Sequence, residues 1–162
     1  MINKTFVTKI EGQSIDFYLV HKDIGLPAKM FYRGQYALYD DEETFGFLDS
    51  LLTKNTETRP FYFFVFNQAM KVTDGALSEY MANICLRYLE TMPCEFLRNI
   101  FQNVSKADRN TWTSFIGWQI YDKKTFDKIM MAVGKNVSTN CSSQKQAWDK
   151  LKPEIENGLE VK

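Results

Sequence analysis

The sequence predicts a mainly α-helical protein, with about seven or eight short-to-medium helices stacked as antiparallel helical hairpins. Apolar residues recur at spacings of three and four along most of the chain, as on the buried face of a helix. Residues 57–92 are the clearest case, because they form two long apolar stretches joined across Thr73-Asp74-Gly75. With 162 residues and no long linker, we expect one helical domain over residues 1–162.

The N-terminal segment, residues 1–26, is less regular than the rest. Within residues 5–20, two β-prone stretches flank Glu11-Gly12-Gln13-Ser14, a pattern typical of a small β-hairpin. The rival interpretation is a helix that starts at Ser14. Strand structure is therefore expected only within residues 5–20.

Residues 28–39 have helical spacing, interrupted by Gly34, and an acidic run of residues 40–43 follows them. These acids are either a cation site or the acidic first turn of the next helix. We favour the helical interpretation, because the positive end of the helix dipole stabilises acids there. That helix is expected to end near Asn55.

The two halves of the 57–92 hairpin differ in clarity. Phe61 to Phe66 is an unbroken apolar run that suits a buried strand or a helix, and its helical continuation to Met70 favours the helix. The second half has apolar residues on two sides. We therefore expect it to be sandwiched between neighbours, with both Ile84 and Leu86 buried.

Helical stripes continue to the C-terminus. Pro93 is expected to end the hairpin, and Gly134 is expected to cap a helix that starts near Thr125. Residues 135–143 are polar, without periodicity, and are expected to form a mobile loop. A last helix over residues 143–151 is expected before Pro153. The remaining predicted features are a stripe over residues 96–104, a helix over residues 110–121 and a frayed tail over residues 153–162.

Composition excludes several classes of function. The 20 basic and 20 acidic residues give a formal net charge of zero, whereas nucleic-acid binding needs a basic field. No apolar run approaches the roughly 18 residues of a membrane span. Three cysteines, one histidine and no CxxC pair give no standard zinc site. We therefore expect no nucleic-acid partner, no membrane span and no metal.

The cysteines leave the compartment open. A Cys94–Cys141 disulfide is one possibility, and Cys85 is expected to be a small buried hydrophobe. The odd number of cysteines and the absence of a signal peptide in the sequence slightly favour the cytoplasm. Export with a leader outside the sequence is the alternative.

No catalytic constellation is visible. His21 is the sole histidine, and no sequence motif places a nucleophile or an acid beside it. The glycines Gly12, Gly25, Gly34 and Gly46 are scattered singly and form no phosphate-binding loop. We expect no catalytic residues, no cofactor and no dependence on His21.

Two functional hypotheses remain. The first is a non-enzymatic helical module that binds another, unidentified protein, with Tyr36, Trp118 and Tyr121 as aromatic anchors. The second is a small-ligand-binding protein or enzyme with a pocket between helices near the 73–79 turn. The polar groups of that pocket would be Arg59, Asp74 and Glu79.

Overall fold

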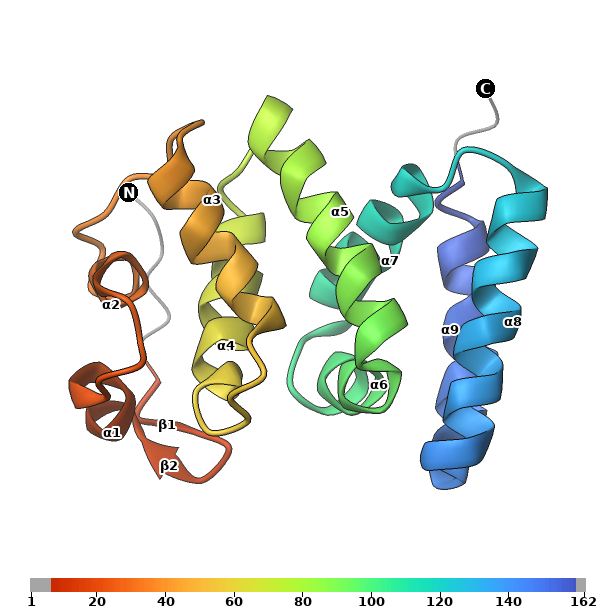
Figure 1. Cartoon of the computed structure of the whole chain (residues 1–162), viewed down its shortest axis with the longest axis horizontal. Helices are drawn as coiled ribbons and strands as arrows, with labels where there is room; N and C mark the ends of the chain where they lie inside the picture. Colours follow the sequence, from red (N-terminus) through yellow and green to blue (C-terminus); the bar gives the residue numbers. More distant parts are fainter. Residues whose placement is uncertain (1–6, 160–162) are drawn as a thin grey trace. The chain divides into compact units, whose positions relative to one another are not determined.

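The computed structural model describes residues 7–159 of the chain (Figure 1). Helices, including two short 3-10 segments, make up 72% of these residues. The described part also contains nine α-helices and a two-stranded antiparallel sheet near its N-terminal end. This confirms the mainly α fold and the position of the strands, although residues 5 and 6 of the predicted hairpin lie outside the description. None of the helices described is long and apolar enough to cross a membrane.

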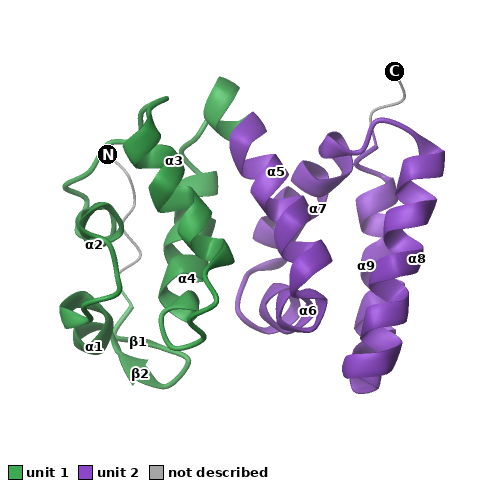
Figure 2. Cartoon of the chain, viewed as in Figure 1, with its two compact units in different colours: residues 1–78 green, residues 79–162 purple. Residues whose placement is uncertain are grey.

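The chain divides into two compact units, unit 1 (Met1–Ser78) and unit 2 (Glu79–Lys162), coloured separately in Figure 2. The sequence offers no linker at this point, because the boundary lies inside helix α5 (Gly75–Thr91). Residues 1–162, which we expected to form one domain, therefore contain two groups of helices. Each group is described by itself.

Unit 1 begins with a tight hairpin of β1 (Lys9–Ile10) and β2 (Gln13–Ser14), in which Lys9 is opposite Ser14 and Ile10 opposite Gln13. Glu11 and Gly12 turn the chain with φ angles of 48° and 81°, as a two-residue hairpin turn requires. Ser14 then caps α1 (Ile15–Val20) by accepting the Phe17 amide at 3.3 Å. Both rival interpretations are therefore correct in part, because the hairpin forms and a helix starts directly after Ser14.

Helix α2 (Leu26–Tyr32) is shorter than the expected helix over residues 28–39. It stops because Gly34 takes a φ of 69°, the left-handed conformation that closes a helix. The amide of Gln35 then donates to the carbonyl of Met30 at 2.8 Å. Residues 35–39 are irregular, which corrects the prediction.

The acidic run forms the start of α3 (Glu42–Asp49), which the 3-10 helix η1 (Ser50–Leu52) extends. Asp41 is the N-cap, and its side chain accepts the Thr44 amide at 2.8 Å. Glu42 and Glu43 lie in the first turn. The helical interpretation of residues 40–43 is therefore confirmed.

Helix α4 (Arg59–Met70) is the interior element of unit 1. Nine of its twelve residues are buried, on several sides of the helix. Within the unit it packs against β1, α2 and η1. The run from Phe61 to Phe66 is thus helical, as its length predicted, and Pro60 occupies the first turn, where its missing N–H is not needed.

Unit 2 holds most of α5, followed by α6 (Pro93–Gln102) and α7 (Lys106–Gln119). Pro93 separates α5 from α6, as predicted. The buried stripe of α5 includes Ile84 but leaves Leu86 half-buried, which corrects the expectation that both are buried. Leu86 lies at the edge of a stripe formed by Met81, Ala82, Ile84, Cys85, Tyr88 and Leu89.

Aromatic side chains join α5, α6 and α7 in the core of unit 2. Tyr88 makes an edge-on contact with Phe96, and Phe96 makes another with Trp112. The Tyr88 hydroxyl donates to Glu95 and accepts from Asn99, both at 2.9 Å. The buried polar atoms of this core are therefore paired, as low-dielectric surroundings require.

Helix α8 (Lys123–Asn140) is much longer than predicted. Gly134 lies in its interior, beside the Trp148 indole, and does not cap it. Residues 135–140, expected in a mobile loop, form its last turns because Val133 and Val137 are both buried, one turn apart. Most polar residues of this stretch face outward. The stretch therefore shows little apolar periodicity in the sequence, although it is helical.

The chain closes with η2 (Ser142–Gln144) and α9 (Lys145–Glu156), which packs against α7 and α8. The expected fraying from Pro153 onward does not apply to residues 153–156, because Ile155 is fully buried and keeps the helix in place. Gly117 of α7 meets Gly158 so closely that an added Cβ would lie 2.6 Å from backbone atoms. Residues 160–162 of the predicted tail lie outside the description.

The stripe on α5 yields a matched test of packing. Leu89→Ala removes a fully buried side chain and should lower the free energy of unfolding by about 2–5 kcal/mol. Leu86→Ala removes the same atoms from a half-buried site and should cost less than half as much. Chemical denaturation of both variants measures the difference, and equal losses would contradict the burial pattern.

Candidate functional site

Hydrogen bonds organise the connection between α1 and α2 in unit 1, residues 20–26, with the sequence VHKDIGL. Val20 ends α1 and Leu26 begins α2, so only five residues connect the helices. Ile24 points inward and is 3% exposed. Pro27 in the first turn of α2 fixes the backbone at the far end. We call this stretch the 20–26 segment.

A hydroxyl from the buried helix α4 holds the 20–26 segment. The Tyr62 hydroxyl accepts the Gly25 amide at 3.0 Å and donates to the Asp23 carbonyl at 3.2 Å. Tyr62 itself is only 5% exposed. One core side chain thus satisfies a donor and an acceptor of the segment's backbone.

His21 fixes the same segment from the other side. Its Nδ1 accepts the Asp23 amide at 3.1 Å, and its Nε2 lies 3.1 Å from Oε2 of Glu57. The Lys29 ammonium donates to the His21 carbonyl at 2.8 Å. The imidazole is largely covered, with 12% of the side chain exposed. Asn55 adds a further tie by donating to the Asp23 carboxylate at 3.3 Å.

These contacts limit the chemistry of His21. A ring nitrogen that accepts an amide N–H carries no hydrogen, so the proton of the neutral ring is assigned to Nε2, which donates to Glu57. Both nitrogens are engaged within the protein.

Aliphatic side chains stand at both ends of the 20–26 segment. Val20 is 81% exposed and Leu26 is 63% exposed. Lys22 and Asp23 lie exposed between them. The segment therefore presents two apolar groups on a backbone whose conformation is fixed by hydrogen bonds, an arrangement that lowers the ordering cost of binding.

Two residues of the predicted polar pocket, Arg59 and Asp74, lie in unit 1. Arg59 is buried at the start of α4, where its Nη1 donates to the Thr53 carbonyl at 2.7 Å. Asp74 is exposed in the turn beyond the other end of α4. Since a helix rises about 1.5 Å per residue, these two residues are separated by roughly the 18 Å length of α4.

Tyr36 packs against α3. Its ring meets Phe47 edge-on, and its hydroxyl lies 3.2 Å from Oγ1 of Thr44 and 3.4 Å from Oε2 of Glu43. Burial is the main cause that raises the pKa of Tyr36 above its ordinary value. The ring is half-buried, so much of its surface already contacts its own unit.

The other predicted residues lie in unit 2. The Glu79 carbonyl accepts from Nε2 of Gln119 at 3.4 Å, which places it near the end of α7. Trp118 is half-buried in the last turn of α7, and Tyr121 follows the helix with 66% of its surface exposed. The Glu79 carbonyl is therefore tied to the C-terminal end of α7. Tyr121 is the most accessible of the predicted aromatic anchors.

Sequence reasoning missed the residues that build the 20–26 segment. Tyr62 is 37 positions from Gly25, and Glu57 is 36 positions from His21, so no local motif links them. A usable signal was present in the segment itself. Ile24 is the one apolar side chain among residues 21–25, which indicates an inward-facing residue in a polar connection.

Among residues 7–159, no group of three or more His, Cys, Asp or Glu side chains is placed to hold a metal ion. The chain matches no family model, no curated protein and no solved structure. A functional proposal therefore rests on the residues and contacts of the chain itself.

The Tyr62 hydroxyl offers a direct test of how the 20–26 segment is held. Tyr62→Phe leaves the Gly25 amide and the Asp23 carbonyl without this partner and should lower the free energy of unfolding by about 1–3 kcal/mol. Tyr39→Phe, the control, removes a hydroxyl from a ring that is 64% exposed and should change stability by less than about 0.5 kcal/mol. Denaturant unfolding measures both. Equal effects would show that the Tyr62 hydroxyl does not anchor the segment.

Proposed function

We propose that this chain is a non-enzymatic protein-interaction module that binds another protein through the 20–26 segment of unit 1. One observation carries the proposal. Val20 and Leu26 are exposed at 81% and 63% on either side of a connection whose backbone is tied to Tyr62 and His21. Scattered apolar side chains on a surface are ordinary, but these two flank a single short segment of fixed conformation.

The energetics favour a protein surface as the partner. Burying an exposed Val or Leu side chain contributes about 1.5–3 kcal/mol each. Because the segment is already ordered, little of that gain is lost to immobilising its backbone. Lys22 and Asp23 provide one charge of each sign between the apolar groups, which suits a polar rim better than a nucleic acid or an anionic surface.

The arrangement of titratable groups supports a non-enzymatic role. Both nitrogens of His21 are engaged with Asp23 and Glu57. Cys85 is fully buried, and burial raises the pKa of its thiol well above the ordinary value. A thiol in that state is a poor nucleophile. The alternative, a pocket near the 73–79 turn, is weakened because Arg59 and Asp74 lie at opposite ends of α4.

The aromatic anchors remain a second candidate surface of the same module. Tyr121 is 66% exposed, whereas Tyr36 and Trp118 are half-buried. We favour Val20 and Leu26 because two accessible side chains share one rigid segment there. Variants at Tyr121 therefore serve as a comparison in the test.

The test begins with a photo-crosslinking amino acid at Lys22, in cells that naturally produce the chain, and with the same group at exposed Met131 on α8 as control. We expect one protein to be captured from position 22. The purified captured protein is then titrated with the parent, with V20S/L26S and with Y121S. V20S/L26S should weaken binding at least tenfold, a loss of about 1.4 kcal/mol, without changing thermal unfolding.

Three outcomes would contradict the proposal. The first is equal capture from positions 22 and 131. The second is unchanged affinity of V20S/L26S for the captured protein. The third is a loss confined to Y121S, which would move the binding surface to unit 2.

A further inference from the structure

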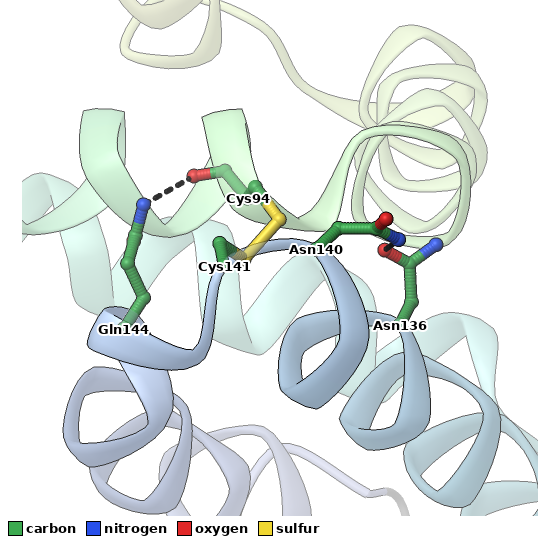
Figure 3. Close-up of a disulfide and its surroundings, with 5 residues drawn as sticks. All are labelled: Cys94, Asn136, Asn140, Cys141 and Gln144. Atoms are coloured by element: carbon green, nitrogen blue, oxygen red, sulfur yellow. Dashed lines mark hydrogen bonds between the residues drawn. A yellow bond between two sulfur atoms is a disulfide. The ribbon is translucent and has the colours of Figure 1, made fainter.

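A disulfide in unit 2 joins two helix ends that are far apart in the sequence. Cys94 lies in the first turn of α6 and Cys141 is the C-cap of α8, with a sequence separation of 47. Their Cα atoms are 5.9 Å apart, within the range that a disulfide spans. Figure 3 shows the bond between the start of α6 and the end of α8.

Hydrogen bonds hold both helix ends at this junction. Nε2 of Gln144 donates to the Cys94 carbonyl at 3.0 Å, which ties η2 to α6 (Figure 3). In the last turn of α8, Nδ2 of Asn140 donates to Oδ1 of Asn136 at 2.9 Å, and the Cys141 amide donates to the Val137 carbonyl. The two cysteines therefore face each other in positions that the surrounding contacts maintain.

The third cysteine does not compete for this bond. Cys85 is fully buried in α5, and burial raises the pKa of its thiol well above the ordinary value. Thiol–disulfide exchange proceeds through a thiolate that must reach the oxidant. Cys94 and Cys141 are half-buried and lie at helix ends, so an oxidant in solution reaches them and not Cys85.

We propose that this chain matures by oxidation of Cys94 and Cys141 and acts in an oxidising compartment outside the cytosol, where unit 2 draws part of its stability from the disulfide. Cytosolic thiol systems keep such pairs reduced, whereas secretory and periplasmic compartments keep them oxidised. This proposal replaces the slight preference for the cytoplasm that the odd number of cysteines suggests.

The maturation step balances as an exchange with a disulfide oxidant, such as oxidised glutathione or an oxidoreductase of the thioredoxin class. The thiolate of one cysteine attacks the oxidant and releases one thiol equivalent. The thiolate of the other cysteine then attacks the mixed disulfide and releases the second equivalent. Two protons and two electrons leave the pair, and the oxidant is reduced to two thiols.

Reduction of the disulfide should lower the stability of unit 2. The bond closes a loop that contains α7 and α8, and such a crosslink restricts the unfolded chain more as the loop grows. We expect a reductant to lower the melting temperature by about 5–15 °C, the shift that a long-loop disulfide gives in a chain of this size.

Free thiols are counted first. The chain is recovered from cells that naturally produce it and denatured in the presence of N-ethylmaleimide, so that the buried Cys85 also reacts, and its remaining thiols are counted by mass after reduction. We expect one blocked thiol, at Cys85, and a pair that reacts only after reduction. Three blocked thiols would overturn the proposal, and this count needs no variant to fold.

Thermal unfolding supplies the second arm. The parent should lose about 5–15 °C in a phosphine reductant and reach the melting temperature of C94S/C141S, which the reductant leaves unchanged. Cys85→Ala, the matched control, should keep the full response to reductant. A parent melting temperature that does not respond to the reductant, despite complete reduction by thiol count, would contradict the stabilising role.

Discussion

Burial of α4 on nearly all sides is the constraint on which unit 1 depends. A helix with apolar residues around most of its circumference must be surrounded, and β1, α2 and η1 supply that cover. Polar atoms taken inside with it must find partners. Arg59 donates to the Thr53 carbonyl, and the Tyr62 hydroxyl bridges Gly25 and Asp23. The geometry of the 20–26 segment is thus a consequence of the hydrogen bonds that the buried Tyr62 hydroxyl of α4 requires.

Unit 2 meets the same requirement with different groups. Rings of Tyr88, Phe96 and Trp112 fill its interior, and the polar atom that Tyr88 carries is paired with Glu95 and Asn99. Small residues let α7 and the end of α9 approach closely. The disulfide adds a covalent tie between the ends of α6 and α8. Each of these devices limits how far the helices of the unit can separate.

The sequence predicted what a single element determines by itself. It placed the α4 helix, the acidic start of α3 and the break at Pro93, because spacing, dipole and proline geometry are local. The sequence-based prediction failed where tertiary contacts determine helix length and burial. Helix α8 continues past Gly134 because Val137 is buried, and Leu86 is only half-buried because it lies at the edge of its stripe. The contacts that hold the 20–26 segment escaped prediction for the same reason. Bonds such as Gly25 to Tyr62 span 37 positions, and periodicity carries no information about them.

The 20–26 segment is rigid before any partner binds. Native-state hydrogen exchange tests this rigidity most directly, because the amides of His21, Asp23, Ile24 and Gly25 all donate within the protein. We expect these amides to exchange at least about a hundredfold more slowly than an unstructured chain, as amides do in hydrogen-bonded, locally stable structure. Exchange of the Gly25 amide at the unprotected rate would show instead that the segment is open in solution and that its backbone is not fixed before binding.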